Sequence, residues 1–167
     1  IEDLSNLALE RGIGFHSDTC VGSFVLPFLE KLGYDVPLYD FRLPGVTQMS
    51  CDVHKYGYAT KGASVILHRN ADWVWLQLFV YESWPSGLYG TPTVAGARPA
   101  GPIAAAWSVM NYLGMDGYLE LMRGLMATTA KIRAGIEAIS ELSIMGNPIG
   151  PLLPCSSDVN DTYAVCD

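Results

Sequence analysis

Hydrophobic and polar residues along the chain follow two different spacings, one typical of helices and one of strands. Residues 1–12 carry apolar side chains at helical intervals and end in a glycine, a common helix stop. Short apolar runs bounded by turn residues indicate buried strands instead. On these grounds helices are predicted at residues 1–12, 22–33, 102–113 and 115–140, the second bent at Pro27 and ended by Gly33. Strands are predicted at residues 13–18, 47–53 and 63–69.

The remaining segments are connections or are ambiguous. Residues 34–46 form a proline-rich connection, and residues 83–102 form a long loop dense in glycine and proline. Residues 73–81 are apolar throughout, which fits either a helix or a strand. Helices that alternate with short apolar strands favour an α/β fold with a mostly parallel sheet.

Three polar residues lie at the end of a predicted strand or just beyond it. Asp18 ends the first strand, and His54 and Lys55 come after the second. Ligands of open α/β sheets bind beyond the carboxyl ends of the strands. We therefore expect these side chains on one rim of the sheet.

Composition and charge narrow the class of protein. Of 167 residues, 50% are hydrophobic and 16% are charged, which is typical of a globular chain with a core. The formal net charge of −7, without a cluster of lysine and arginine, argues against nucleic acid or an anionic membrane as a partner. The cysteines are scattered without a CxxC pair, so reduced thiols are expected rather than a disulfide framework or a zinc knuckle, and no metal site is predicted.

Each candidate residue has a structural explanation beside its chemical one. Asp18 is either a turn aspartate or a carboxylate aimed at a cationic ligand atom. Lys55 either extends to solvent or, partly desolvated at a strand end, supplies an amine that attacks a carbonyl. His54 either caps a turn or donates to a phosphate, and Lys61 is a solvated charge or a second cation for an anionic substrate.

The loop at residues 83–102 carries a second set of polar groups. Thr91 and Thr93 are possible phosphate donors, and Arg98 is a possible clamp for an anion. A loop rich in glycine and proline also needs polar groups to satisfy its own backbone.

Three stretches of the sequence carry a family resemblance: "HSDTCVGSFVLPF", "DFRLPGVTQMSCDVHKYGYATKGASVILHRN" and "GLYGTPTVAGARPAG". In this order they resemble the pyridoxal-phosphate-dependent group II decarboxylase superfamily, and within it the sphingosine-1-phosphate lyase branch with its bacterial relatives. The sequence departs from the family pattern at Thr60, where proline is usual, at Ser86, where glycine is usual, and at Ala97, where serine is usual.

The resemblance implies a role for each matching residue. Lys55 matches the lysine that forms a Schiff base with the cofactor aldehyde, and Asp18 matches the carboxylate that pairs with the pyridine nitrogen. Cys20 falls under the ring, and His54 falls beside the cofactor phosphate. The remaining two matches are Lys61, near the substrate, and Thr91, expected to reach the phosphate of the neighbouring subunit's cofactor.

The resemblance also implies an architecture and a reaction. Residues 1–114 would be the second half of a fold-type I (aspartate-aminotransferase-like) large domain, and residues 115–167 a linking helix and the start of a small α+β domain. The expected reaction is a retro-aldol cleavage of a phosphorylated long-chain amino alcohol to an aldehyde and ethanolamine phosphate. An amino-acid decarboxylase of the same superfamily is the first alternative, and a non-catalytic scaffold piece is the second.

The ends of the chain suggest a fragment, because it opens on Ile1 inside a predicted helix and closes at Asp167 in another. The resemblance places the glycine-rich phosphate loop and the ring-stacking aromatic residue before Ile1, so the chain alone is expected to be inactive. A homodimer with its active site at the subunit interface is expected. The visible part is expected to be cytoplasmic, with a membrane anchor in an earlier segment as an open alternative.

Overall fold

The computed structural model describes residues 1–166, apart from the side chains of residues 165 and 166. Two compact units make up the chain. The first consists of Ile1–Phe24 with Pro37–Asn111, and the second of Val25–Val36 with Tyr112–Asp167. The predicted domain boundary after residue 114, which refers to a longer protein, stays a prediction.

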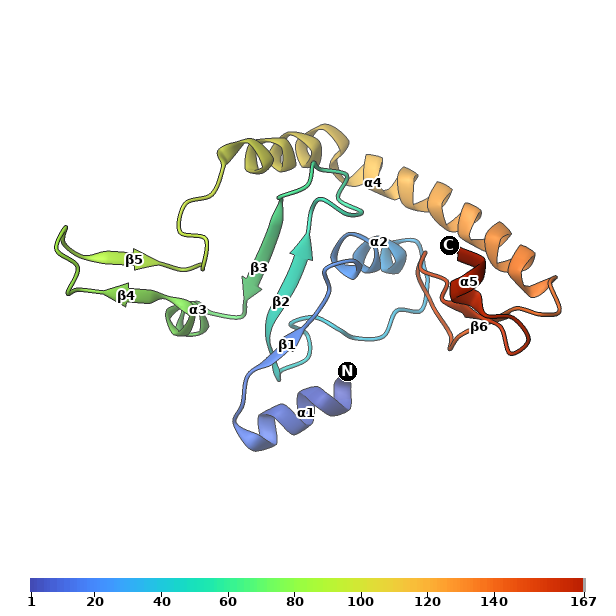
Figure 1. Ribbon diagram of the computed structural model, residues 1–167, viewed down its shortest axis with the longest axis horizontal. Coiled ribbons are helices and arrows are strands. Elements are labelled where there is room, and N and C mark those ends of the chain that lie inside the picture. Colours follow the sequence, from blue (N-terminus) through green and yellow to red (C-terminus); the bar gives the residue numbers. More distant parts are fainter. Residues whose placement is uncertain (167) are drawn as a thin grey trace. The chain divides into compact units, whose positions relative to one another are not determined.

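The first unit is built on a three-stranded sheet that follows helix α1 (Glu2–Arg11). Its strands are β1 (Phe15–Ser17), β2 (Val46–Asp52) and β3 (Ser64–His68), in the order β1-β2-β3 (Figure 1). β1 runs parallel to β2, whereas β3 runs antiparallel to it. The mixed α/β character is therefore confirmed, but only one of the two strand pairs in this sheet is parallel. The short connection between β2 and β3 explains this, because a parallel pair needs a longer crossover.

Strand β3 differs from its neighbour in burial. Most of β2 is buried, whereas Val65, Ile66 and Leu67 of β3 each expose 41–44% of their surface. The prediction that residues 63–69 form a buried strand is thus right about the strand and wrong about its burial within this chain. β3 has no strand neighbour beyond β2 among the described residues, so one of its edges is open.

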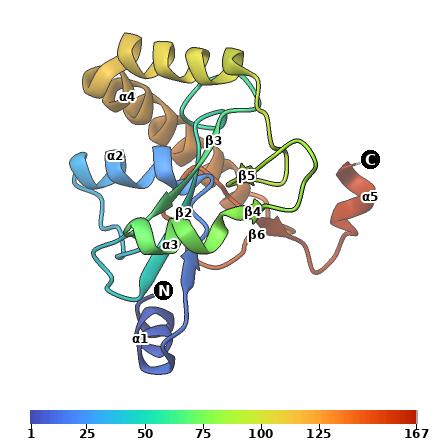
Figure 2. The same ribbon diagram turned by 90° about the vertical axis from the view of Figure 1, so that its left-hand side faces the viewer.

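The ambiguous apolar segment at residues 73–81 contains both kinds of structure. Helix α3 (Ala71–Gln77) begins at Asn70, whose side chain accepts a hydrogen bond from the Trp73 amide. Strand β4 (Phe79–Tyr81) follows and pairs antiparallel with β5 (Tyr89–Thr91), which lies within the predicted glycine/proline loop (Figure 2).

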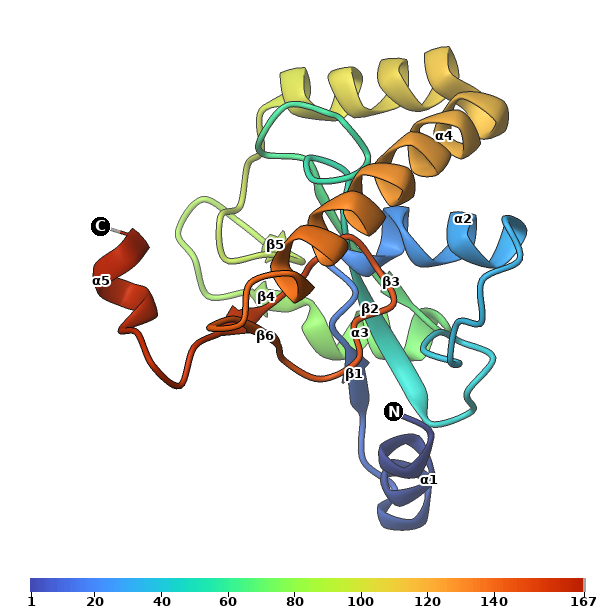
Figure 3. The same ribbon diagram turned by 90° about the vertical axis from the view of Figure 1, so that its right-hand side faces the viewer.

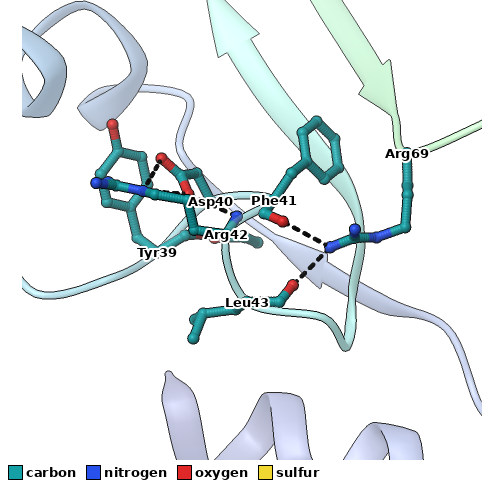
Figure 4. Close-up of polar contacts among 7 residues, drawn as sticks. Tyr39, Asp40, Phe41, Arg42, Leu43 and Arg69 are labelled. Carbon is teal, nitrogen blue, oxygen red and sulfur yellow. Dashed lines mark hydrogen bonds and ion pairs between the residues drawn. The ribbon is translucent and has the colours of Figure 1, made fainter.

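Arg69 ties the end of β3 to the connection that leads into β2 (Figure 4). Its guanidinium donates to the carbonyl oxygens of Val46 at 2.7 Å, Phe41 at 2.9 Å and Leu43 at 2.6 Å. The guanidinium carbon also lies 5.5 Å from the centre of the Phe41 ring. One side chain thereby bonds two carbonyls of a connection without regular structure and the carbonyl of the first residue of β2.

Replacing Arg69 with methionine is expected to destabilise the folded protein by about 2 kcal/mol, because its three hydrogen bonds are lost and the Leu43 carbonyl keeps only the Val46 amide as donor. Urea unfolding of the full-length variant measures the change. Arg42→Met is the matched control. Its side chain, on the same connection, is itself about half exposed and bonds Asp40, so a change below about 1 kcal/mol is expected. Equal losses in the two variants would contradict the role of Arg69.

The second unit contains the paired β6 (Ser143–Ile144) and β7 (Cys155–Ser156), the short α5 (Thr162–Cys166), and helix α2 (Leu26–Lys31), which follows the 3-10 turn Gly22–Phe24. The predicted bend at Pro27 is not found, because Pro27 lies in the first turn of α2. A proline in the first turn removes no helical hydrogen bond, since the amides there have no partner within the helix. The ring of Phe28 stacks on Tyr118 at 5.1 Å.

Helix α4 (Ala100–Glu137) consists of two helical runs. Gly114 interrupts it with φ 57° and ψ −170°, a conformation that favours glycine (Figure 3). This confirms the prediction of two helices divided between residues 113 and 115. Although α4 is long, none of the described helices is both long and apolar enough to cross a membrane.

Candidate active site

Asp18 lies directly after β1, where the sheet holds its carboxylate in an ionised form. Oδ1 accepts a hydrogen bond from the Ser50 hydroxyl at 2.6 Å and another from the Cys20 amide at 3.1 Å. These two bonds, that of Ser50 being the stronger cause, lower the pKa of Asp18 to about 2. The neighbouring strand β2 therefore supplies a donor that keeps the side chain after β1 negatively charged.

Removing the Ser50 hydroxyl is expected to raise the pKa of Asp18 toward its ordinary value. A carboxylate whose pKa is depressed in the folded state stabilises the fold above its unfolded pKa near 4, and loses that contribution as pH falls toward 2. Ser50→Ala should therefore cost more stability at pH 5 than at pH 2.5, as urea unfolding of the full-length protein measures. In an Asp18→Asn background this pH dependence should vanish, and its persistence there would contradict the assignment.

Lys55 lies in a turn just beyond β2 and forms an ion pair with Asp52. The Lys55 amide donates to the Asp52 carbonyl at 3.2 Å, which closes the turn, and Nζ lies 2.8 Å from Asp52 Oδ2. The hydrogen bond to Asp52 is the main cause that raises the pKa of Lys55, and a contact with the Cys20 side chain adds to it. Because the Cys20 carbonyl also accepts from the Asp52 amide at 3.3 Å, the ends of β1 and β2 meet here.

His54 closes the loop that carries Lys55. Its backbone amide and its ring Nδ1 both lie within hydrogen-bond distance of the Ala63 carbonyl, at 3.1 and 2.7 Å. Since a carbonyl only accepts, Nδ1 carries a proton. Nε2 then faces Asp52 Oδ2 at 3.8 Å. The carbonyl of Ala63, the residue just before β3, thus fixes the orientation of the His54 ring.

Lys61 and Thr91 are not brought into this cluster. Lys61 is exposed, and no hydrogen bond or ion pair of its side chain is found among the described residues. Thr91 is buried at the end of β5, where its hydroxyl bonds the backbone of Thr93. Arg98 lines an apolar cavity of about 440 Å³, together with Ala63 and Ser64 and with residues at the start of α4.

Asp52 is the residue that the sequence-based prediction missed. It accepts from Lys55 and also from the Ser64 hydroxyl, the residue opposite it in β3. Burial opposes its ionisation, but these hydrogen bonds outweigh burial and lower its pKa. Its signal in the sequence is the three-residue spacing from Lys55 at a strand end, which brings a carboxylate and an amine together across one turn.

The polar side chains described above thus gather beyond the adjacent ends of β1 and β2: Asp18, Cys20, Ser50, Asp52, His54 and Lys55. Sphingosine-1-phosphate lyase from Dictyostelium discoideum is 46% identical to the chain over 165 residues, which are 96% of this chain and 31% of that protein. The solved sphingosine-1-phosphate lyase of Burkholderia pseudomallei matches with a TM-score of 0.91 and 41% identity, over 99% of this chain and 38% of that one. The chain is homologous to part of sphingosine-1-phosphate lyase.

This homology confirms the resemblance seen in the three sequence stretches. The lyase-homologous chain spans about a third of the length of the lyases it matches. Glutamate decarboxylase of Lactobacillus brevis shares the fold, with a TM-score of 0.74 at 19% identity over 95% of this chain and 36% of that one. No protein-family model matches the chain.

Proposed function

We propose that the protein containing this chain is a pyridoxal-phosphate-dependent lyase. Its substrate would be a phosphorylated long-chain amino alcohol, cleaved in a retro-aldol reaction to an aldehyde and ethanolamine phosphate. The observation that carries the proposal is the placement of an ionised carboxylate, Asp18, and a lysine amine, Lys55, beyond the ends of two adjacent strands of a lyase-homologous chain.

The chemistry of the cluster fits pyridoxal phosphate. The cofactor has an aldehyde, which a primary amine can bond. It also has a pyridine nitrogen, which an ionised carboxylate can keep protonated. Lys55 supplies the amine, and the carboxylate of Asp18 stays ionised at physiological pH because Ser50 and the Cys20 amide stabilise the anion. When bound, the cofactor accepts the electron pair released as a bond at the substrate's amine-bearing carbon breaks.

Five residues of this chain would bind the cofactor or the substrate or carry a proton. Asp18 would hold a proton on the ring nitrogen, and Cys20 would underlie the ring. His54, whose ring is fixed by the Ala63 carbonyl, would donate from its other nitrogen to the cofactor phosphate when protonated. Lys55 would bond to the cofactor aldehyde and later carry a proton at Nζ. Lys61, exposed in the same loop, would attract the substrate phosphate.

Product analysis of the full-length protein tests the reaction. With sphingosine-1-phosphate as substrate, we expect release of a long-chain aldehyde and ethanolamine phosphate in equal amounts. Glutamate and aspartate serve as decarboxylase substrates, and carbon dioxide release from either, without aldehyde from the lipid, would replace the lyase by an amino-acid decarboxylase. No turnover of any of them by cofactor-loaded protein would contradict both activities.

We further propose that the protein is a homodimer in which Thr91 serves the partner subunit's site. Apolar side chains are widely exposed on α3 and the β4–β5 pair, among them Trp75 at 67%, Leu76 at 77% and Leu88 at 74%. Patches of this kind mark surfaces that another protein surface covers. Thr91 lies at the end of β5, beside this exposed surface and outside the Lys55 cluster.

Mixed dimers distinguish a role of Thr91 within its own subunit from a role in the partner. A dimer of one Lys55→Ala subunit and one Thr91→Ala subunit holds one intact site if Thr91 acts across the interface. Such mixtures should recover about a quarter of the wild-type activity, although each variant alone is nearly inactive. Absence of recovery in verified mixed dimers would place Thr91 in its own subunit's site or in none.

A further inference from the structure

The Asp52 carboxylate is held by two side chains, one of which is the Lys55 amine. Lys55 Nζ lies 2.8 Å from Oδ2, the Ser64 hydroxyl donates to Oδ1, and His54 Nε2 lies 3.8 Å from Oδ2. The Asp52 side chain is only 12% exposed, whereas that of Lys55 is 35% exposed. A well-anchored carboxylate therefore meets a more mobile amine.

We propose that Asp52 is a positioning residue that holds Lys55 in place as an ammonium ion whenever the lysine is not bonded to the cofactor. This inference rests on the proposed function of Lys55 and adds a residue to it. Asp52 bonds the lysine across a single turn, and the Ser64 hydroxyl in β3 anchors the carboxylate.

Charge around Lys55 supports the same conclusion. The groups that face its amine are the Asp52 carboxylate and the Cys20 thiol, and His54 Nε2 lies 3.8 Å from the same carboxylate oxygen of Asp52. Asp18 directs its Oδ1 to Ser50 and the Cys20 amide instead. Asp52 is thus the anion that contacts the lysine, and its hydrogen bond raises the pKa of Lys55.

A held ammonium has two consequences for the chemistry. An amine condenses with an aldehyde by its lone pair, forming a carbon–nitrogen double bond as the carbonyl oxygen leaves with two hydrogens as water. An ammonium has no lone pair until it gives one proton to solvent, so Asp52 slows the first loading of cofactor at neutral pH. When it is not bonded to the cofactor, Lys55 would stay an ammonium ion even at alkaline pH values where an ordinary lysine begins to lose its proton.

Competitive acetylation of the cofactor-free, full-length protein tests the ion pair directly. Trace acetic anhydride is applied between pH 7 and pH 11.5, and labelling of Lys55 is compared by peptide mass spectrometry with that of Lys61, which is exposed in the same loop. In the wild type we expect Lys55 to label more slowly, with its midpoint at higher pH. In Asp52→Asn the labelling of Lys55 at pH 8 should rise about tenfold relative to Lys61, as a fall of one pKa unit gives.

Two further variants separate charge from packing. Asp52→Glu keeps the negative charge and should restore most of the wild-type midpoint. Ser64→Ala leaves the charge in place but removes one anchor, and should raise Lys55 labelling about threefold; it decides the question if Asp52→Asn does not fold. An unchanged ratio of Lys55 to Lys61 in both Asp52→Asn and Ser64→Ala, or an equal rise in Asp52→Glu and Asp52→Asn, would overturn the proposal.

Cofactor loading of the same samples keeps the two proposals apart. Pyridoxal phosphate is added to each cofactor-free variant and the visible band is followed between pH 6 and pH 9. Faster loading of Asp52→Asn at pH 7, by about tenfold, is expected. If labelling responds to Asp52 but no variant develops a band, the ion pair stands and the proposed function fails. If bands form normally but labelling is unaffected, the function stands and the role of Asp52 fails.

Discussion

Lys55→Ala in the full-length protein is expected to abolish covalent attachment of pyridoxal phosphate and to lower kcat by about 10³-fold or more, since the variant loses both the bonding amine and its proton transfer. The wild type should show a visible absorbance band that borohydride removes, with the added mass on the Lys55 peptide. Equal bands in wild type and variant, or mass on another lysine, would end the assignment of Lys55.

Lys61→Ala is the matched control for that experiment, because it removes a lysine from the same loop. Its visible band should persist, since the exposed Lys61 side chain makes no hydrogen bond or ion pair with Asp18, Asp52 or Lys55 among the described residues. Lys61→Ala is expected instead to raise KM for a phosphorylated substrate. A raised KM with an unchanged band would separate substrate binding from cofactor attachment within a single loop.

Gly45→Ala is expected to lower the free energy of unfolding by about 3 kcal/mol, the range of forced overpacking in a core. Gly45 lies just before β2, and a Cβ there would overlap the carbonyl oxygen of Ser5, which is fully buried in α1. The Gly45 amide also donates to the Ser5 hydroxyl at 2.9 Å. Relief of the overlap would pull α1 away from the start of β2.

Gly124→Ala supplies a control of opposite sign for the same urea unfolding measurement. Gly124 lies on the exposed side of α4, with open space where its Cβ would be, so alanine should stabilise the helix by about 0.5–1 kcal/mol. A stable Gly45→Ala variant, or one that loses no more than Gly124→Ala gains, would show that the contact between Ser5 and Gly45 adapts without cost.

The parts of the fold that the sequence predicted correctly are those with strong local signals. Gly114 breaks the long helix because its backbone adopts a conformation that other residues avoid. Residues 73–81 could not be assigned because helix α3 and strand β4 are equally apolar there and meet without a glycine or proline between them. The burial of β3 depends on what covers it, which its own apolar sequence does not determine.

The residues of the candidate site also differ in how strong their local sequence signals are. Asp18 and Lys55 were predictable because each follows an apolar strand, and the parallel pairing of β1 with β2 brings such positions to one rim. Asp52 was missed because it is the last residue of β2 and reads as part of the strand. Its importance depends on the turn that folds Lys55 back toward it and on Ser64 across the ladder, contacts that appear only in three dimensions.

The open strand β3 matters for how the protein is handled in the laboratory. A strand edge with unpaired backbone groups and the apolar sequence Val65-Ile66-Leu67 is a template for pairing with other chains. Expressed by itself, the segment of residues 1–167 should form concentration-dependent aggregates through this edge. Val65→Lys or a proline at Ile66 would reduce that aggregation in the isolated segment, yet should harm the full-length protein if another strand pairs with β3 there.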